Sequence, residues 1–473
     1  MELKSLPVKI RNGVTIHVPN SPNVLTSYVL LEQEAWFEDE VAFVSQLLQP
    51  GECAVDIGAN FGVYTTAMAE RVGAQGTVFA FEPASETCTY LRATAALRHA
   101  KTVQVVQAAL SNRGGTADLL VSSDPELNAL ATSNNTASAR ETVRLLTLDE
   151  YLADWRDRKL SVVKVDAEGH EHQVIAGARE ALRRDEPVIM FEIRLNGKLD
   201  LTLLDTLQPL GFTGFSLVPG LNILVPFERD GTPDKFQLNL FAATERRATE
   251  LERRGLLVRQ PGHVSPTTTS SLPAMGEIVG GWTTTPAARE PYAACLAHYA
   301  QASSTAHPGD QITHLFTAIQ LASQACQESR TIARLLTFAR LAGIFGLRAQ
   351  VVRALVAIAD DLMRPGFALP AEPFLRPGRS LASSSKDDGQ RTVATAALEA
   401  LERARRYSSF FGGTAVLPLL DHLCRQPDCS PEMQRRRQLV RMRAGLQWAP
   451  EPHPQLARDT ADNLNAWFWN TVR

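Results

Sequence analysis

VDIGANFGVYT, residues 55–65, is the stretch that decides the fold of this chain. It ends the apolar run of residues 53–55, which is typical of a buried strand, and it leads into residues 64–71, whose apolar spacing predicts a helix. Small and polar residues crowd the turn between them: Asp56, Gly58, Asn60 and Gly62. Glycine lets a backbone approach a ligand closely, and a helix that begins here points free N–H groups at it. The stretch therefore predicts a ligand site on an α/β sheet.

An acidic residue follows the next predicted strand. Glu82 lies in VFAFEP, residues 78–83, about 20 residues after the turn, where a carboxylate accepts ribose hydroxyls in nucleoside-binding folds. Gly58 and Gly62 are separated by three residues, so the G-x-G-x-x-G pattern of dinucleotide sites is absent, as is the G-x-x-x-x-G-K-[ST] of P-loops. The sequence therefore predicts a nucleoside-type ligand and favours one without a pyrophosphate.

Strand and helix signals alternate as far as about residue 245. The predicted strands are 78–81, 103–106, 117–121, 143–146, 162–165, 188–193, 212–218 and 221–225, with 236–241 as a further candidate. The predicted helices between them include 85–97, 148–155, 171–184 and 201–207. Before this series, Asn12-Gly13 between alternating apolar residues predicts a hairpin over 8–18, and an amphipathic pattern predicts a helix over 36–48. The alternation favours a mostly parallel sheet covered on both faces.

The composition describes an ordinary globular protein. With 473 residues the chain is too long for one core, and a net charge of −3 gives no reason to expect nucleic-acid binding. Its N-terminus has no apolar segment of signal-peptide length, and no run of 18 apolar residues occurs. Six scattered cysteines suit a reduced compartment. We therefore expect a cytoplasmic protein with no membrane span.

The pattern changes after residue 245. We expect an N-terminal hairpin and helix over 1–50, the α/β domain over 51–245, a linker rich in Pro, Gly, Ser and Thr over 246–290, and an α-helical domain over 291–473. The helical domain would bind a protein partner, hold a homo-oligomer or shape access to the site. The polar loop 122–141 is either a cover for the site or an ordinary surface loop.

Two further stretches carry chemistry. VVKVDAEGHE, residues 162–171, brings Asp166, Glu168 and His170 to the end of a strand, and MFEIR, residues 190–194, brings Glu192 to the end of another. Ligands of open α/β sheets bind at the carboxyl ends of the strands. Because buried carboxylates are costly unless they are paired or functional, acids gathered at this edge indicate a working site.

Six motifs in this order resemble the FkbM family of S-adenosylmethionine-dependent methyltransferases: VDIGANFGVYT, FEP, AALS, TLDEYL, VKVDAEGHE and FEI. The resemblance covers roughly residues 36–193. It implies a Rossmann-like seven-stranded methyltransferase sheet, here with an N-terminal β-hairpin and a C-terminal α-helical domain. It also implies methylation of hydroxyl groups on natural products and sugars. The implied cofactor is S-adenosyl-L-methionine, in a pocket formed by Asp56, Gly58, Asn60, Gly62, Glu82, Pro83, Ala109 and Ser111.

The implied reaction is an in-line displacement, for which positioning supplies much of the rate and a base helps. The candidate bases are Asp166, Glu168, His170 and Glu192; we favour Asp166 or His170, with Glu168 and Glu192 orienting the acceptor. A hard cation held by the three acids is the lesser alternative. Glu168 and His170 could each instead cap the helix that follows, and this structural interpretation stays open for both.

Two rival functions remain open. The chain could be a non-catalytic adenosylmethionine-binding scaffold of a glycan-biosynthesis assembly, or it could methylate an amine or a carboxyl group. The intact set of acids disfavours the scaffold, and charge repulsion disfavours a carboxylate acceptor. The predicted function is therefore O-methylation of a sugar, glycan or other polyhydroxylated small molecule.

Overall fold

The computed structural model of the chain describes residues 5–122, 129–130, 139–155, 158–195, 197–231, 233–260, 278–279, 289–362, 372–376, 389–446 and 454–471. Most of the predicted polar loop, residues 123–128 and 131–138, lies outside these ranges, as does much of the predicted linker. Contacts divide the chain into two compact units. The first comprises residues 1–216, 238–250 and 434–473, and the second comprises 217–237 and 251–433.

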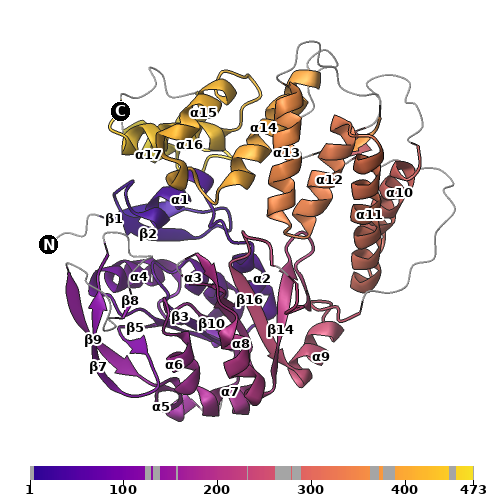
Figure 1. The fold of residues 1–473 in the computed structure, drawn as a ribbon. Coiled ribbons are helices and arrows are strands. Elements are labelled where there is room, and N and C mark those ends of the chain that lie inside the picture. The colour runs from indigo at the N-terminus through magenta and orange to yellow at the C-terminus, as the bar shows by residue number, and fades with distance from the viewer. Residues whose placement is uncertain are drawn as a thin grey trace. The chain divides into compact units, whose positions relative to one another are not determined.

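An eight-stranded mixed sheet forms the core of the α/β part (Figure 1). Its order is β15-β14-β16-β11-β10-β3-β4-β5, with bounds Ile223–Pro226, Phe212–Val218, Asn239–Thr244, Val188–Glu192, Leu160–Val165, Cys53–Ile57, Thr77–Phe81 and Val103–Val106. The five strands from β11 to β5 are parallel, and β16 is antiparallel to both of its neighbours. The Rossmann-like α/β prediction is confirmed. The expected count of seven is exceeded because β15, the second arm of the predicted closing hairpin, extends the edge.

The sheet is buried on both faces, as a parallel sheet requires. Every residue of β3, β4, β10 and β16 is buried. The helices of this part have the following bounds: α1 Leu25–Gln33, α2 Glu40–Leu47, α3 Val63–Val72, α4 Ser85–Arg98, α5 Leu148–Tyr151, α6 Glu171–Ala176, α7 Arg179–Asp185, α8 Thr202–Leu207, α9 Glu245–Arg253, α16 Pro431–Arg443 and α17 Ala466–Thr471. Parallel strands joined by helices bring their carboxyl ends to one edge, and that edge positions the site.

Smaller sheets flank the main one. β1 (Ser5–Lys9) and β2 (Thr15–Pro19) pair antiparallel around Asn12-Gly13, which confirms the predicted hairpin. A four-stranded sheet has the order β6-β9-β7-β8, with bounds Ala109–Leu110, Arg140–Leu146, Gly115–Leu120 and Ala129–Leu130. β7 and β9 are antiparallel, as their patterns indicated. The short strands β12 (Arg194–Leu195) and β13 (Lys198–Leu199) form a further pair.

Two helix predictions were wrong in detail. The predicted helix 36–48 begins only at Glu40, and residues 36–38 precede it as extended or turning chain. The predicted helix 171–184 is two helices, α6 and α7, broken at Gly177. A Cβ on Gly177 would lie 2.0 Å from the carbonyl oxygen of Ser111, so the chain approaches that loop too closely for any other residue. Helix α1 was not predicted.

The second unit is helical. Its helices are α10 Tyr292–Ser304, α11 Pro308–Glu328, α12 Ile332–Ile344, α13 Arg348–Leu362, α14 Gly389–Arg405 and α15 Leu417–Leu423, with a short strand pair β17 (Ile278–Val279) and β18 (Phe374–Leu375) (Figure 1). Apolar stripes at 3.6-residue spacing build two clusters, one around Tyr292 and Leu341 and one around Leu336 and Leu401. In the described part of the chain, no helix combines the length and apolarity needed to cross a membrane.

Candidate functional site

Two turns meet at the carboxyl edge of the sheet, one after β3 and one after β10. The strands pair in parallel up to Ile57 and Val165, so both turns begin at the same level. Gly58 has φ 70°, and Asn60 and Glu168 have φ 48° and 50°, which is uncommon for residues with side chains. A Cβ on Gly58 would lie 2.0 Å from the carbonyl oxygen of Asp166. The turns are therefore packed backbone to backbone, and the strained residues lie at the place where a ligand would bind.

The first cavity opens beside these turns and has a volume of about 630 Å³, part of it open to solvent. Five of the eight predicted cofactor-binding residues line it: Gly58, Asn60, Glu82, Pro83 and Ala109. Apolar side chains such as Phe81, Leu110 and Leu119 make up much of the remaining wall. A cavity with an apolar wall and a few convergent polar groups is typical of a small-molecule site.

Polar groups suited to a nucleoside face this cavity. The Glu82 carboxylate accepts the backbone N–H groups of Asn60 and Ala84, each at 3.0 Å, which fixes its orientation and leaves lone pairs for hydroxyl donors. Burial raises the pKa of Glu82 to about 7, although these bonds act in the opposite direction. Within the described part of the chain, Asn60 Oδ1 has no hydrogen-bond partner. A buried acceptor without a partner fits a ligand that donates to it.

The other three predicted cofactor residues support the cavity from behind. Asp56 is fully buried, accepts the Thr65 hydroxyl at 2.6 Å and lies 3.5 Å from Lys164 Nζ. Gly62 precedes α3 with φ 96°, where a Cβ would lie 2.8 Å from Leu91. Ser111 is buried, and its hydroxyl lies 2.9 Å from Nε2 of His170. The sequence identified the turns that border the cavity, but not which of their side chains line it.

A second cavity, of about 890 Å³ including space open to solvent, adjoins the same turns. It shares four residues with the first: Gly58, Asn60, Asp166 and Glu168. Its remaining wall comes from distant parts of the chain, including Leu25, Trp36, Phe37, Glu38, Tyr64, Lys164, Glu192 and Asn239. All of these residues belong to the first unit.

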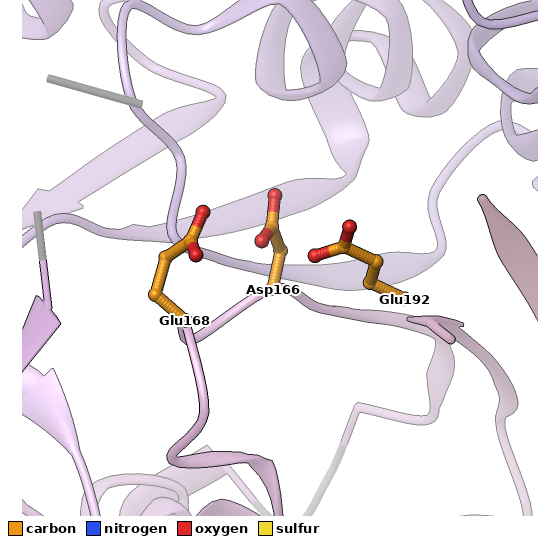
Figure 2. A group of neighbouring side chains, drawn as sticks. All are labelled: Asp166, Glu168 and Glu192. Atoms are coloured by element: carbon orange, nitrogen blue, oxygen red, sulfur yellow. The ribbon is translucent and has the colours of Figure 1, made fainter. Parts of the chain in front are cut away.

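Three predicted acids are brought together at the boundary between the cavities. In Figure 2 Asp166 lies between Glu168 and Glu192, and the three carboxylates point to the same side. An oxygen from each lies within 4.8 Å of the others. Burial, reinforced by the neighbouring carboxylates, raises the pKa of Glu168 to about 8 and that of Glu192 to about 9. Protonation of these acids would relieve this repulsion, and so would a hard cation with oxygen ligands.

Lys164 joins the two turns. Its Nζ donates to Asp166 Oδ2 at 3.0 Å and to the Gly58 carbonyl at 3.1 Å, and its side chain is 6% exposed. Burial alone would lower the pKa of Lys164, but the carboxylates of Asp166 and Asp56 raise it above its ordinary value. Lys164 is therefore a fixed cation that pairs with acids.

The fourth predicted catalytic residue, His170, lies elsewhere. His170 lines the first cavity, whereas Glu192 lines only the second. The Nε2 of His170 is hydrogen-bonded to the Ser111 hydroxyl. Burial lowers the pKa of His170, with Glu171 acting against the shift. Burial thus favours the neutral form of this imidazole, which lies on the side of the first cavity and is hydrogen-bonded to Ser111.

Several other polar residues that line the second cavity with the acids were not predicted from the sequence. Glu38 Oε2 accepts the Tyr64 hydroxyl at 2.5 Å and the Asn239 amide at 3.2 Å. Burial raises the pKa of Glu38, although the Tyr64 bond acts in the opposite direction. The only available signal was the run Trp36-Phe37-Glu38, where two aromatic residues precede acids, and it was assigned to a helix.

Parts of the chain are similar to known proteins. Residues 56–213 match a family model described as the methyltransferase FkbM domain. A hexuronic acid methyltransferase, AglP of Haloferax volcanii, is 28% identical over 153 residues, which are 32% of this chain and 61% of that protein. The crystal structure of methyltransferase FkbM from Methylobacillus flagellatus is 18% identical with a TM-score of 0.29, covering 48% of this chain and 56% of that one. A methyltransferase structure from Aquifex aeolicus is 13% identical with a TM-score of 0.27, covering 47% of this chain and 97% of that one. The chain thus spans less than two thirds of the first two relatives.

Proposed function

We propose that this chain, in which residues 56–213 are an FkbM methyltransferase domain, transfers a methyl group from S-adenosylmethionine to a hydroxyl group of a sugar or another polyhydroxylated small molecule. The observation that carries the proposal is the wall that the two cavities share, made of Gly58, Asn60, Asp166 and Glu168. A donor in one cavity and an acceptor in the other would face each other across it. Such positioning can supply much of the rate enhancement of a methyl transfer.

The first cavity fits the cofactor. Glu82 is fixed by two backbone N–H groups and can accept ribose hydroxyls, and Asn60 Oδ1 is a buried acceptor that awaits a donor. The apolar wall around Leu110 and Leu119 suits an adenine ring. When bound, adenosylmethionine supplies a methyl group on a sulfonium, and the methyl–sulfur bond breaks as the bond to the acceptor oxygen forms. The residues of the chain supply the rest.

The proton of the acceptor hydroxyl needs a base in the second cavity. Asp166 and Glu168 line both cavities, so either can reach an oxygen placed beside the methyl group, whereas His170 lines only the first. We assign the proton to Asp166, because Lys164 holds its carboxylate at the boundary and keeps a cation beside it. Glu192, whose pKa of about 9 keeps it protonated at neutral pH, would donate a hydrogen bond to the acceptor.

A carbohydrate acceptor suits the second cavity. Trp36 and Phe37, with ring centroids 4.4 Å apart, give it an aromatic surface, and Glu38 and Asn239 add polar groups that bond hydroxyls. The relative from Haloferax volcanii is named for methylation of a hexuronic acid, which supports a sugar. Asp166 must be ionised to act as the base, and its negative charge in this cavity favours a neutral sugar over a uronate.

The experiment is methyl transfer by the full chain from labelled adenosylmethionine to a panel of methyl hexosides, methyl hexuronosides and sugar nucleotides. Asp166→Asn should lower turnover by about 10²–10⁴-fold while calorimetric binding of S-adenosylhomocysteine persists. The exposed Asp118→Asn substitution is the matched control. No binding of adenosylmethionine to the wild-type protein would overturn the proposal. Binding without transfer to any member of the panel would favour the non-catalytic scaffold.

A further inference from the structure

The wall of the second cavity that contains Trp36, Phe37 and Glu38 begins where α1 ends. The C-cap of α1 is Glu34, which adopts a left-handed conformation with φ 54° and whose side chain is fully buried. Its backbone is held on both sides: its N–H bonds the Leu30 carbonyl at 3.0 Å, and its carbonyl accepts the N–H of Arg11 at 2.8 Å. A non-glycine residue holds such a conformation only where its surroundings fix it.

The surroundings that fix Glu34 come from the other end of the chain. Glu34 Oε1 accepts the backbone N–H of Leu464 at 2.6 Å, the backbone N–H of Asn465 at 3.2 Å and the side-chain amide of Asn465 at 3.1 Å. The same Asn465 side chain bonds both the N–H and the carbonyl of Lys9, each at 2.9 Å. The buried amide of Asn465 thus hydrogen-bonds both β1 and the C-cap of α1, which lie more than 430 positions earlier in the chain.

A buried arginine completes the contact. Arg435 is fully buried, and its Nη1 lies 3.5 Å from Glu34 Oε2 and 2.6 Å from the carbonyl of Asp462. Its Nε donates to the carbonyl of Glu32 at 2.8 Å. All of these residues belong to the first unit, so the contact is a feature of the body that contains the site. A network this buried and this connected fixes its members in one arrangement.

We propose that Asn465 is a positioning residue for acceptor recognition, which acts through Glu34 to place the Trp36–Glu38 wall of the second cavity. Glu38 follows Glu34 by four residues, and its carboxylate accepts the Tyr64 hydroxyl inside that cavity. Loss of the Asn465 amide would release the end of α1 and, with it, Glu38. The first cavity has no residue of this wall, so cofactor binding would persist. The inference rests on the proposed function for its meaning, and on the contacts alone for its geometry.

The test follows the phenol of Tyr64, which reports on Glu38 without needing an acceptor. Full-length protein is labelled with 3-fluorotyrosine, and the spectrum of Tyr64→Phe identifies the Tyr64 fluorine resonance among those of the seven tyrosines. Asn465→Ala and the milder Asn465→Ser are compared with Asn470→Ala, an exposed asparagine of the same segment that bonds only the Ala457 carbonyl among the contacts the structure describes. Each variant is also titrated with S-adenosylhomocysteine in a calorimeter.

We expect the Tyr64 resonance to shift or broaden in both Asn465 variants, with the Tyr151 resonance and the affinity for S-adenosylhomocysteine unchanged. Asn470→Ala should match the wild type. With an acceptor from the sugar panel, KM should rise roughly tenfold at unchanged kcat, as expected for one lost hydrogen bond to a charged group. An unchanged Tyr64 resonance in folded Asn465→Ser would overturn the inference. Failure of the wild type to bind S-adenosylhomocysteine would instead overturn the proposed function, so the two failures are distinct.

Discussion

Replacing Lys164 by methionine tests whether one buried cation holds the two turns of the site together. Its Nζ lies 3.0 Å from Asp166 Oδ2 and 3.5 Å from Asp56 Oδ1, and Asp56 is only 1% exposed. Methionine keeps the length of the side chain and removes its charge. Breaking a buried ion pair from one side costs about 3–5 kcal/mol, because the remaining charge has no partner. At roughly 2–4 °C per kcal/mol, the first unit should melt roughly 6–20 °C lower.

Scanning calorimetry on the full chain measures this loss. The transition that S-adenosylhomocysteine raises belongs to the unit that contains the site, which separates it from the helical unit. The exposed Lys101→Met is the matched control and should melt with the wild type. The double variant Lys164→Met with Asp56→Asn removes both charges, and it should recover much of the loss because a neutral pair leaves no buried charge.

The pH dependence of the loss gives a second check. Burial raises the pKa of Asp56, and Lys164 opposes that shift, so the pKa of Asp56 in the folded variant should lie higher still. A carboxyl whose folded pKa is raised contributes stability below its unfolded pKa and loses it as pH rises through the folded value. The deficit of Lys164→Met should therefore be smaller at about pH 5 than at about pH 8. A deficit below about 1 kcal/mol, or a double variant no more stable than the single one, would refute the reasoning.

Three other predictions concern the cavities. Because burial raises the pKa of Glu82 to about 7, the affinity for adenosylmethionine should fall as the pH drops below that value. In calorimetry Glu82→Gln should bind adenosylmethionine weakly at every pH. A wild-type affinity that does not change with pH would contradict this prediction. Burial raises the pKa of Glu192 to about 9, so the wild-type protein should lose stability as the pH rises towards that value. Relative to the wild type, Glu192→Gln should therefore become about 1–3 kcal/mol more stable between about pH 5 and pH 8 in thermal unfolding. An unchanged difference in melting temperature between the two proteins at these two pH values would be evidence against burial as the cause. Adenosylmethionine should bind equally with and without EDTA, because Glu82 and Asn60 need no cation to hold a nucleoside. Weaker binding in EDTA would indicate that a cation held by the acid cluster takes part in cofactor binding.

Local chemistry made most of the fold predictable from the sequence. The alternation of strands and helices decided the class, and Asn12-Gly13 decided the first hairpin, since both signals depend on neighbours along the chain. The break at Gly177 was not predictable, because a glycine inside a helical pattern is usually tolerated and its reason here is the Ser111 carbonyl. In the same way β16 enters the sheet between β11 and β14, an order that depends on packing.

The candidate site was also predictable only in part. The two motifs after β3 and β10 were predictable because carboxyl ends of parallel strands meet at one edge, and the structure brings Asp166, Glu168 and Glu192 together there. Which of the predicted residues face a ligand was not predictable. Asp56 and Ser111 do not line the first cavity; Asp56 is hydrogen-bonded to Thr65, and Ser111 to His170. A sequence motif does not specify the side-chain rotamers that decide this.

Part of the second cavity escaped prediction for another reason. Trp36–Glu38 and Asn239, which line it, lie outside residues 56–213, far apart in the chain, and carry no shared pattern. The first cavity lies within residues 56–213, where the family match is found, and so do the four residues that the two cavities share. If the acceptor binds in the second cavity, the residues of that cavity outside the motifs can change the choice of acceptor without altering the first cavity. Substitutions at Trp36 or Glu38 should then alter which sugars are methylated while the affinity for adenosylmethionine stays the same.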